Sequence, residues 1–335
     1  MRAARLHAVG DLRVADEPVP VPGPGESLVR VTAIGICGSD LHWWDQGGIG
    51  DAALDHPLVL GHEAAGVIAD GPRRGQRVAI DPAIPDRTCR LCRAGYYNLC
   101  LNIRFAGHGQ QDGAMREFMT WPGELLHPLP DEVSDADGAV LEPLGVAIHA
   151  FDLGHVRLGA PAVVVGAGPI GLLLVQLLQV AGAGTVTVFE PLAHRREAAA
   201  VLGAAVADPA EAADPAVLRA LVGEGAAVAF EIAGSSEAVQ LAMAATWAGG
   251  RVVLGGIPDD DITTFGAAMA RRKGLTIAMV RRMNEVYPRA ITLASAGKVD
   301  LTSLVTGRYP LEDAATAFAS ASRRAGEKII IEPAP

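Results

Sequence analysis

Short apolar runs alternate with longer stretches of helical spacing between about residues 145 and 281. The clearest example is residues 161–180, where the run PAVVV leads through the turn GAGPIG into the apolar stretch LLLVQLLQV. Buried parallel strands read as continuous apolar runs, and strands that alternate with helices form βαβ units. The pattern therefore predicts a doubly wound parallel sheet of the Rossmann type. Its other elements are expected as strands at residues 185–190, 226–233 and 251–255 and helices at 208–222 and 236–247.

The two ends of the chain show a different pattern. The apolar runs before residue 145 are short and are interrupted by Pro and Gly, as at residues 27–33, 65–69 and 76–80. The tail holds helical stretches at 288–297 and 311–324 and a closing strand at 328–331. We expect an α/β protein in which residues 1–145 and 282–335 form a β-rich domain and residues 146–281 form the parallel-sheet domain.

A membrane span is the alternative for residues 161–180. No charged residue lies between Arg157 and Glu190, and about 20 apolar residues suffice to cross a bilayer. However, glycines and prolines interrupt the run, and Gln176 and Gln179 occupy its centre. We therefore favour the βαβ unit.

The turn after the first strand of this unit has the spacing of a dinucleotide-binding loop. Gly166 allows a sharp turn, Gly168 lets the backbone approach a pyrophosphate, and Gly171 lets helix and strand pack closely. Glu190 ends the next strand 19 positions after Gly171, where a carboxylate meets the ribose hydroxyls of NAD. Arg195 and Arg196 speak for NADP instead, unless they lie on the following helix. The candidate cofactor-binding residues are Gly166, Gly168, Pro169, Ile170, Gly171, Glu190 and Arg195.

Composition narrows the class of protein. The 335 residues are 50% hydrophobic, which is enough for two cores, and the net charge of −10 argues against nucleic-acid or anionic-membrane binding. The N-terminus lacks the apolar segment of a signal peptide, so we expect a cytoplasmic protein. The chain has four cysteines, at positions 37, 89, 92 and 100. Their clustering in a reducing compartment indicates metal binding rather than disulfides.

Three pieces of the β-rich front carry candidate metal ligands, namely ICGSDLH at residues 36–42, GHEAAG at 61–66 and LEPL at 141–144. A thiolate, an imidazole and carboxylates form the ligand set of a catalytic zinc site. Each piece alone has a simpler interpretation. Cys37 could be a small buried residue, His62 a hydrogen-bonded core residue, and Glu142 an acid near a helix start.

Taken together, these motifs resemble the zinc-dependent medium-chain dehydrogenase/reductase family over essentially the whole chain. The segments CGSDLHWW and LEPLGVAIHA are similar to its polyol branch, the sorbitol (L-iditol) dehydrogenases. The resemblance implies a GroES-like β-rich catalytic domain beside the Rossmann domain, and zinc-assisted hydride transfer to NAD. It also implies roles for individual residues: Cys37, His62 and Glu63 as zinc ligands, Glu142 as an acid that binds the zinc directly or through water, Ser39 and His42 as a proton relay, and Asp40 as a group that orients the ligands.

The remaining cysteines match the family's structural-zinc lobe with one departure. An aspartate stands where the family has the first of four cysteines, and the resulting ligand set is Asp86, Cys89, Cys92 and Cys100. Aspartate oxygen is an acceptable zinc ligand, so a second zinc is expected. The alternative is a metal-free lobe held by packing of Leu91, Tyr96, Tyr97 and Leu99.

The resemblance also implies a substrate pocket lined by Trp43, Phe118 and Arg281. Arg282 stands where the polyol pattern has an aromatic residue, and Ala52 replaces a bulkier side chain. These two departures argue against sorbitol itself as the substrate. A second guanidinium suits a sugar acid, since Arg binds carboxylates bidentately. Diol or amino-alcohol oxidation and a catalytically inactive dinucleotide-binding protein are the further alternatives. A small alcohol or ketone is the expected partner, together with copies of the same chain in a homodimer or homotetramer.

Overall fold

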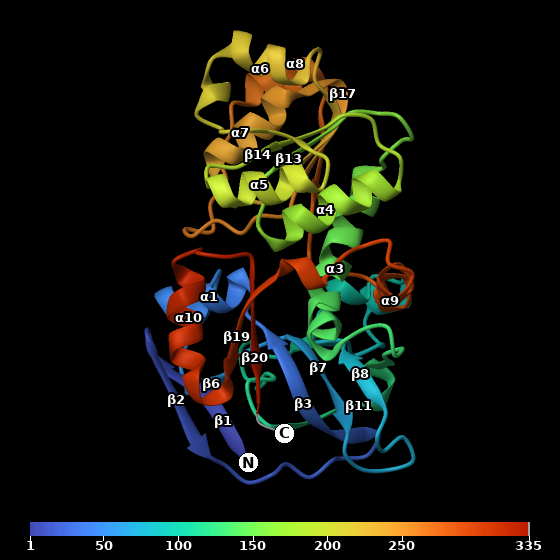
Figure 1. Cartoon of the computed structure of the whole chain (residues 1–335), viewed down its shortest axis with the longest axis vertical. Helices are drawn as coiled ribbons and strands as arrows, with labels where there is room; N and C mark the ends of the chain where they lie inside the picture. The colour runs from blue at the N-terminus through green and yellow to red at the C-terminus, as the bar shows by residue number, and fades with distance from the viewer. Residues whose placement is uncertain (334–335) are drawn as a thin grey trace. The chain divides into compact units, whose positions relative to one another are not determined.

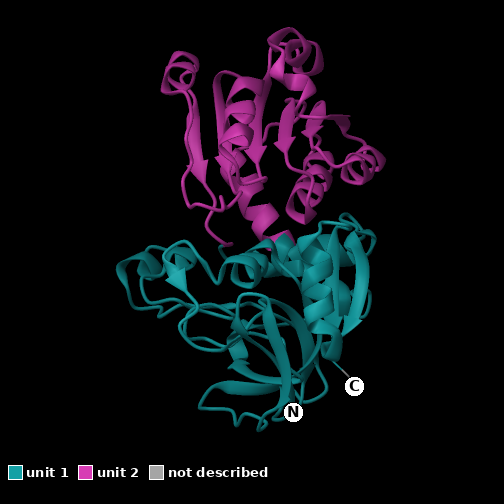
Figure 2. Cartoon of the chain, turned by 90° about the vertical axis from the view of Figure 1, so that its left-hand side faces the viewer, with its two compact units in different colours: residues 1–143, 284–335 teal, residues 144–283 magenta. Residues whose placement is uncertain are grey.

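The computed structural model describes residues 1–333 and divides the chain into two compact units (Figure 2). Unit 1 comprises Met1–Pro143 and Asn284–Pro335, and unit 2 comprises Leu144–Met283. These limits lie two residues from the expected domain limits at each junction. Helix α3 (Asp135–Gly154) runs through the first junction and contains Pro143.

Unit 1 is built on a seven-stranded sheet. Its order is β12-β8-β7-β3-β20-β19, and β11 pairs with β3. The strands are β3 (Glu26–Gly35), β7 (Glu63–Ile68), β8 (Arg77–Ile80), β11 (Phe118–Pro122), β12 (Leu126–Pro128), β19 (Val305–Pro310) and β20 (Lys328–Glu332). Smaller sheets are formed by β1 (Arg2–Ala8), β2 (Asp11–Asp16) and β6 (Leu58–Val59), by β4 (Gly48–Ile49) and β5 (Ala52–Ala53), and by β9 (Ala83–Ile84) and β10 (Arg104–Phe105).

The tail of the chain completes this sheet. Strand β20 pairs antiparallel with β3, so that Ile331 faces Ile34, and both residues are fully buried. Helix α10 (Ala314–Ser322) packs against β20 and α1 (Gly38–Gln46), and buries Phe318 in the same core (Figure 1). The remaining helices of unit 1 are α2 (Arg90–Arg93) and α9 (Tyr287–Ser295). The returning tail is therefore part of the β-rich core.

Unit 2 is a six-stranded sheet of order β15-β14-β13-β16-β17-β18 in which every neighbouring pair is parallel. Along the chain, the strands begin at the centre of the sheet with β13 and continue outward to β15 on one side. They then run outward from β16 to β18 on the other side, as in a Rossmann fold. The strands are β13 (Ala162–Val165), β14 (Val186–Phe189), β15 (Ala205–Ala207), β16 (Ala226–Glu231), β17 (Thr246–Leu254) and β18 (Thr276–Met279). The helices are α4 (Pro169–Val180), α5 (Ala193–Val201), α6 (Pro215–Val222), α7 (Ser236–Ala245) and α8 (Ala267–Lys273). The expected doubly wound sheet is confirmed.

The apolar segment at residues 161–180 is divided between β13 and α4. All four residues of β13 are buried. A Cβ on Gly171 would lie 2.0 Å from the Gly166 carbonyl oxygen, so the helix starts in direct contact with the turn. Within residues 1–333, the structure contains no helix of the length and apolarity that crossing a bilayer requires.

Two expected helices differ from the observed ones. Helix α7 ends at Ala245 rather than near Trp247, because Lys273 Nζ donates to the carbonyls of Met243, Ala244 and Thr246 at 2.6–3.0 Å and β17 begins at once. The stretch 208–222 is broken before α6, where the Asp214 side chain accepts from Ala216 N at 2.8 Å and Pro215 follows as the first helical residue.

Candidate active site and metal centres

The donor atoms of Cys37, His62 and Glu63 lie within 4.8 Å of one another. Cys37 follows the end of β3, and Glu63 begins β7 opposite Gly35 of β3. The antiparallel pairing of these two strands therefore brings the motifs at 36–42 and 61–66 to one place. Sulfur, imidazole nitrogen and carboxylate oxygen are the donors of a catalytic zinc site, so these residues fit zinc.

Asp40 orients this group from the first turn of α1. Its carboxylate accepts from Cys37 N at 3.0 Å and from Gly61 N at 3.2 Å, and it lies 3.4 Å from His62 Nδ1. A carboxylate on the far nitrogen of a ligating histidine fixes the tautomer and the ring orientation. Burial lowers the pKa of His62, but Asp40 and Cys37 outweigh burial and raise it overall. A metal would displace the proton that this ring holds.

Lys328 on β20 holds the carboxylate of Glu63. Its Nζ donates to Glu63 Oε1 at 2.8 Å, to Glu63 Oε2 at 2.7 Å and to the Ile36 carbonyl at 3.0 Å. Lys328 is 2% exposed and Glu63 is fully buried. A Cβ on Gly35 would lie 2.0 Å from Glu63 Oε2, so Gly35 leaves room for this carboxylate. The ammonium therefore joins both ligand-bearing segments to the returning tail.

Ser39 and His42 lie on α1, and Glu142 lies on α3. Ser39 Oγ is 3.3 Å from His62 Nε2, whereas His42 Nδ1 is 3.2 Å from Gln46 Oε1 on the next turn. Glu142 is buried, and burial raises the pKa of its carboxyl to about 8. Among the described residues it is not part of the group of three donors. Of the two residues expected to form the proton relay, Ser39 is thus the one that contacts the ring of His62.

Asp86, Cys89, Cys92 and Cys100 form a second group with donor atoms within 4.8 Å of one another. The three thiols are free, and Asp86 N donates to Cys100 Sγ at 3.2 Å. Backbone N–H groups of Cys89 and Thr88, together with the Asn102 amide, hold the pKa of Asp86 below its usual range. Three sulfurs and one carboxylate oxygen fit a closed tetrahedral zinc site.

The expected substrate-pocket residues occupy different places. Trp43 is buried, and the edge of its ring meets His108 at 5.5 Å between ring centroids. The aromatic ring that packs on His62, at 5.2 Å, belongs to Phe105, whereas Phe118 lies on β11 opposite Arg30. Arg281 is exposed and follows β18 in unit 2.

In unit 2, the glycine turn joins β13 to α4. Gly166 has φ 99°, which favours glycine, and Gly168 precedes Pro169, the first residue of α4. Glu190 directly follows β14, and its two carboxylate oxygens accept from Ala167 N at 2.8 Å and from Leu192 N at 2.9 Å. The acid therefore lies against the turn, as the sequence spacing predicts.

Arg195 and Arg196 both lie on α5, as expected, and have different partners. Arg196 donates to the carbonyls of Glu190 and Pro191 and to Asp208. Arg195 Nη1 is 3.6 Å from the position of a Cβ on Gly168, so it lies beside the turn. Arg196 thus donates to protein groups, and Arg195 lies beside the glycine turn.

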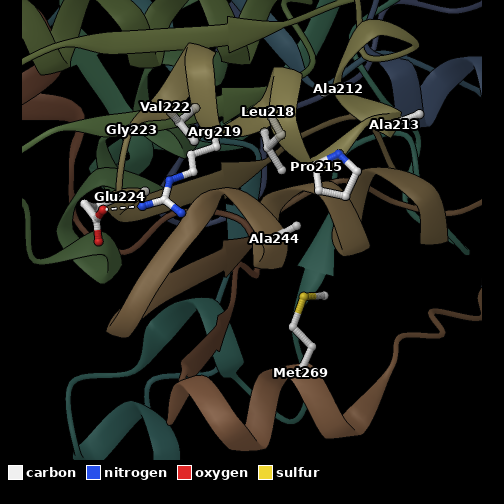
Figure 3. Close-up of a pocket in the computed structure, with 11 residues that line it drawn as sticks. Ala212, Ala213, Pro215, Leu218, Arg219, Val222, Gly223, Glu224, Ala244 and Met269 are labelled. Atoms are coloured by element: carbon white, nitrogen blue, oxygen red, sulfur yellow. Dashed lines mark hydrogen bonds and ion pairs between the residues drawn. The ribbon is translucent and has the colours of Figure 1, made fainter.

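A cavity of about 370 Å³ lies elsewhere in unit 2, between α6, α7 and α8 (Figure 3). Leu218, Val222 and Met269 line it, together with the exposed ion pair of Arg219 and Glu224 at 2.9 Å. None of the residues predicted from the sequence lines this cavity. The candidate catalytic site is therefore identified by its metal-donor groups and not by the size of a cavity.

Sequence reasoning missed Lys328 and Phe105. Lys328 is one of three lysines among 28 basic residues, and that rarity was the available signal. Phe105 follows the cysteine lobe in a segment with no motif of its own.

We predict that Lys328→Met lowers the free energy of unfolding of the metal-free protein by about 3–5 kcal/mol, because Glu63 is then left as an unpaired buried charge. Zinc should also leave the Cys37 group faster. Chemical denaturation and zinc release to a chelator measure the two effects. Lys273→Met is the matched control, since it removes a lysine with three backbone acceptors in unit 2. It should lower stability and leave zinc release unchanged, and equal zinc release in both variants would contradict the role of Lys328.

A second prediction concerns the cysteine lobe. Freshly purified protein should contain two zinc ions per chain, and Cys89→Ser should lower the melting temperature, because a structural zinc contributes directly to folding. Elemental analysis and calorimetry test both. One zinc per chain with unchanged melting of Cys89→Ser would favour the metal-free lobe.

Comparison with known proteins gives the same assignment. The alcohol dehydrogenase GroES-like domain family matches residues 23–131, and the zinc-binding dehydrogenase family matches residues 169–296. Sorbitol dehydrogenase of Gallus gallus is 37% identical over 345 residues, which cover 99% of this chain and 96% of that protein.

Solved structures of similar proteins cover at least 97% of each chain. L-idonate 5-dehydrogenase of Escherichia coli has a TM-score of 0.92 at 25% identity, covering 99% of this chain and 97% of that one. For 2R,3R-butanediol dehydrogenase of Bacillus subtilis the TM-score is 0.89 at 29% identity, with 99% of both chains covered. A Sinorhizobium meliloti protein described as a zinc-binding dehydrogenase, bound to NADP, has a TM-score of 0.90 at 31% identity, again with 99% of both covered. This chain belongs to the zinc-dependent medium-chain dehydrogenase/reductase family, in its sorbitol dehydrogenase-like polyol branch.

Proposed function

We propose that this enzyme oxidises a secondary hydroxyl of a polyol or sugar-derived substrate, using zinc at Cys37, His62 and Glu63, and NAD as the hydride acceptor. The observation that carries the proposal is the convergence of these three donors beside Ser39. Zinc would supply a Lewis acid for the substrate oxygen, and the dinucleotide would accept the hydride.

The residues around the donors have separate tasks in this proposal. Asp40 keeps the His62 ring in one orientation, and Lys328 keeps the Glu63 carboxylate in place. Ser39 Oγ takes the hydroxyl proton and passes it outward along α1, where His42 lies one turn on. Because Glu142 does not join the group of three donors, we assign it to holding water at the site rather than to permanent ligation.

Glu190 supports NAD over NADP. Its carboxylate is fixed against the glycine turn by two backbone N–H groups, where it would accept from the ribose hydroxyls and repel a 2′-phosphate. Arg195 is close enough to the turn to serve a phosphate, and one similar structure holds NADP. We assign Arg195 to the pyrophosphate, because Glu190 occupies the position that discriminates between the cofactors.

The substrate class follows from the relatives and from the aromatic surroundings of the zinc donors. The similar proteins act on sorbitol, L-idonate and 2R,3R-butanediol, according to their names. Phe105 packs its ring on His62 at 5.2 Å between ring centroids, and Trp43, whose edge meets His108, lies on α1 together with Ser39. We favour a polyol over a simple diol because sorbitol dehydrogenase is similar to this chain over 99% of its length.

We also propose a homo-oligomer located in the cytoplasm and a structural zinc at Asp86, Cys89, Cys92 and Cys100. Strand β18 is an outer strand of its sheet and exposes Ile277 and Met279, which favours association with a second copy. All four cysteines are free thiols, as in proteins of a reducing compartment.

A substrate screen tests this function. Purified enzyme with NAD should oxidise C5 and C6 polyols with higher kcat/KM than 2,3-butanediol, threonine or an aldonate. Cys37→Ala should lower kcat by a factor on the order of a thousand, because the Lewis acid supplies several kcal/mol. The Cys37→Ala variant should still bind NAD, as measured by fluorescence titration. Full turnover of Cys37→Ala after chelation would overturn the zinc mechanism, and a preference for aldonates would identify a sugar-acid dehydrogenase.

Cofactor choice gives a further prediction. The wild type should prefer NAD, and Glu190→Ala should narrow the gap to NADP by roughly tenfold, since removal of a like charge near the phosphate is worth about 1 kcal/mol or more. Glu190→Gln is the matched control, because it removes the charge and keeps an acceptor for Ala167 N. Both variants should shift in the same direction in kcat/KM. Equal kcat/KM for the two cofactors in the wild type would contradict the assignment.

A further inference from the structure

Asp86 departs from the four-cysteine pattern, and its carboxylate is held on both sides. Oδ1 accepts from the backbone N–H of Thr88 at 2.8 Å and of Cys89 at 2.9 Å. Oδ2 accepts from Asn102 Nδ2 at 2.6 Å. Three donors therefore set the direction of a side chain that would otherwise rotate freely.

Asn102 stands two residues after the ligand Cys100. Because Asp86 N also donates to Cys100 Sγ at 3.2 Å, the two ends of the lobe are joined by a backbone–sulfur bond and a side-chain bond side by side. The contacts to Thr88 and Cys89 belong to the local turn at Asp86. The Asn102 contact is different, since it reaches across the lobe from a residue 16 positions away.

A carboxylate ligand needs such support more than a thiolate does. A sulfur carries its charge on one atom, whereas a carboxylate can bind through either oxygen and turns about two bonds. Hydrogen bonds to a ligating carboxylate restrict these choices, and losing one such partner typically lowers metal affinity by about 10- to 100-fold.

We propose that Asn102 is a positioning residue for a divalent metal in the cysteine lobe, and that Asp86 and Asn102 together replace the fourth thiolate of the family pattern. The proposal rests on the metal occupancy of this lobe and is independent of the identity of the substrate. Asn102 presents one oxygen of Asp86 to the site shared with Cys89, Cys92 and Cys100. Its role exists only while residue 86 is a carboxylate.

The test is a double-mutant comparison on the full-length zinc enzyme. Asn102→Leu and the isosteric Asn102→Asp both remove the donor to Asp86, and each is made in the wild type and in Asp86→Cys. Zinc release to a chelator is followed together with polyol turnover, which reports the Cys37 site. With Asp86 present, both substitutions should speed the release of one of two zinc ions by roughly 10- to 100-fold and leave turnover intact. In Asp86→Cys they should change release by less than about threefold.

Asn284→Leu is the matched control, because the Asn284 amide also donates to this lobe, at the Gly95 carbonyl, 2.9 Å away. It should leave zinc release at the wild-type rate. An equal effect of Asn102→Leu with Asp86 and with Cys at position 86 would show that Asn102 only stabilises the lobe, and would overturn the proposal. One zinc per chain in the wild type would overturn it as well, whereas a failed substrate screen would not affect it.

Discussion

Lys328 and Glu63 are removed from solvent together, and the strands that carry them flank β3 in one sheet. Taking two charges out of water costs several kcal/mol each unless they are paired and hydrogen-bonded. Here the ammonium has three acceptors, two from Glu63 and one from the Ile36 carbonyl. This pair forms only when the last strand reaches the first domain. The β-rich unit therefore includes a strand that follows unit 2 in the sequence, and the position of the Glu63 carboxylate depends on that strand.

The rarity of lysine in this chain has a physical meaning. Of 28 basic residues three are lysines, and two of these have three oxygen acceptors each: Lys328 at the zinc donors and Lys273 at the end of α7. A compact ammonium directs three protons to closely spaced oxygens, whereas a planar guanidinium is larger and forks in one plane. The space at Glu63 is tight, since any Cβ at position 35 would collide with its carboxylate. A lysine therefore fits these two places better than an arginine would.

Most of the features that the sequence predicts come from local sequence patterns. The apolar run, the glycine turn and Glu190 lie within 30 residues, and the structure joins them through the bond from Ala167 N to Glu190. The metal ligands were predicted through family resemblance, and each motif alone left a structural explanation open. Lys328 could not be predicted, because its partner is 265 residues away and depends on the pairing of β20 with β3. Phe105 was missed for a similar reason, since its contact with His62 arises from folding of the segment after the cysteine lobe.

The proposed zinc site at Cys37, His62 and Glu63 depends on the contact between Lys328 and Glu63. Anomalous X-ray diffraction at the zinc absorption edge, from crystals of the protein as purified, tests it most directly. We expect an anomalous peak bounded by Cys37 Sγ, a ring nitrogen of His62 and the Glu63 carboxylate, with the Lys328 ammonium still in contact with Glu63. Crystals with zinc in the cysteine lobe and no peak at Cys37 would contradict it.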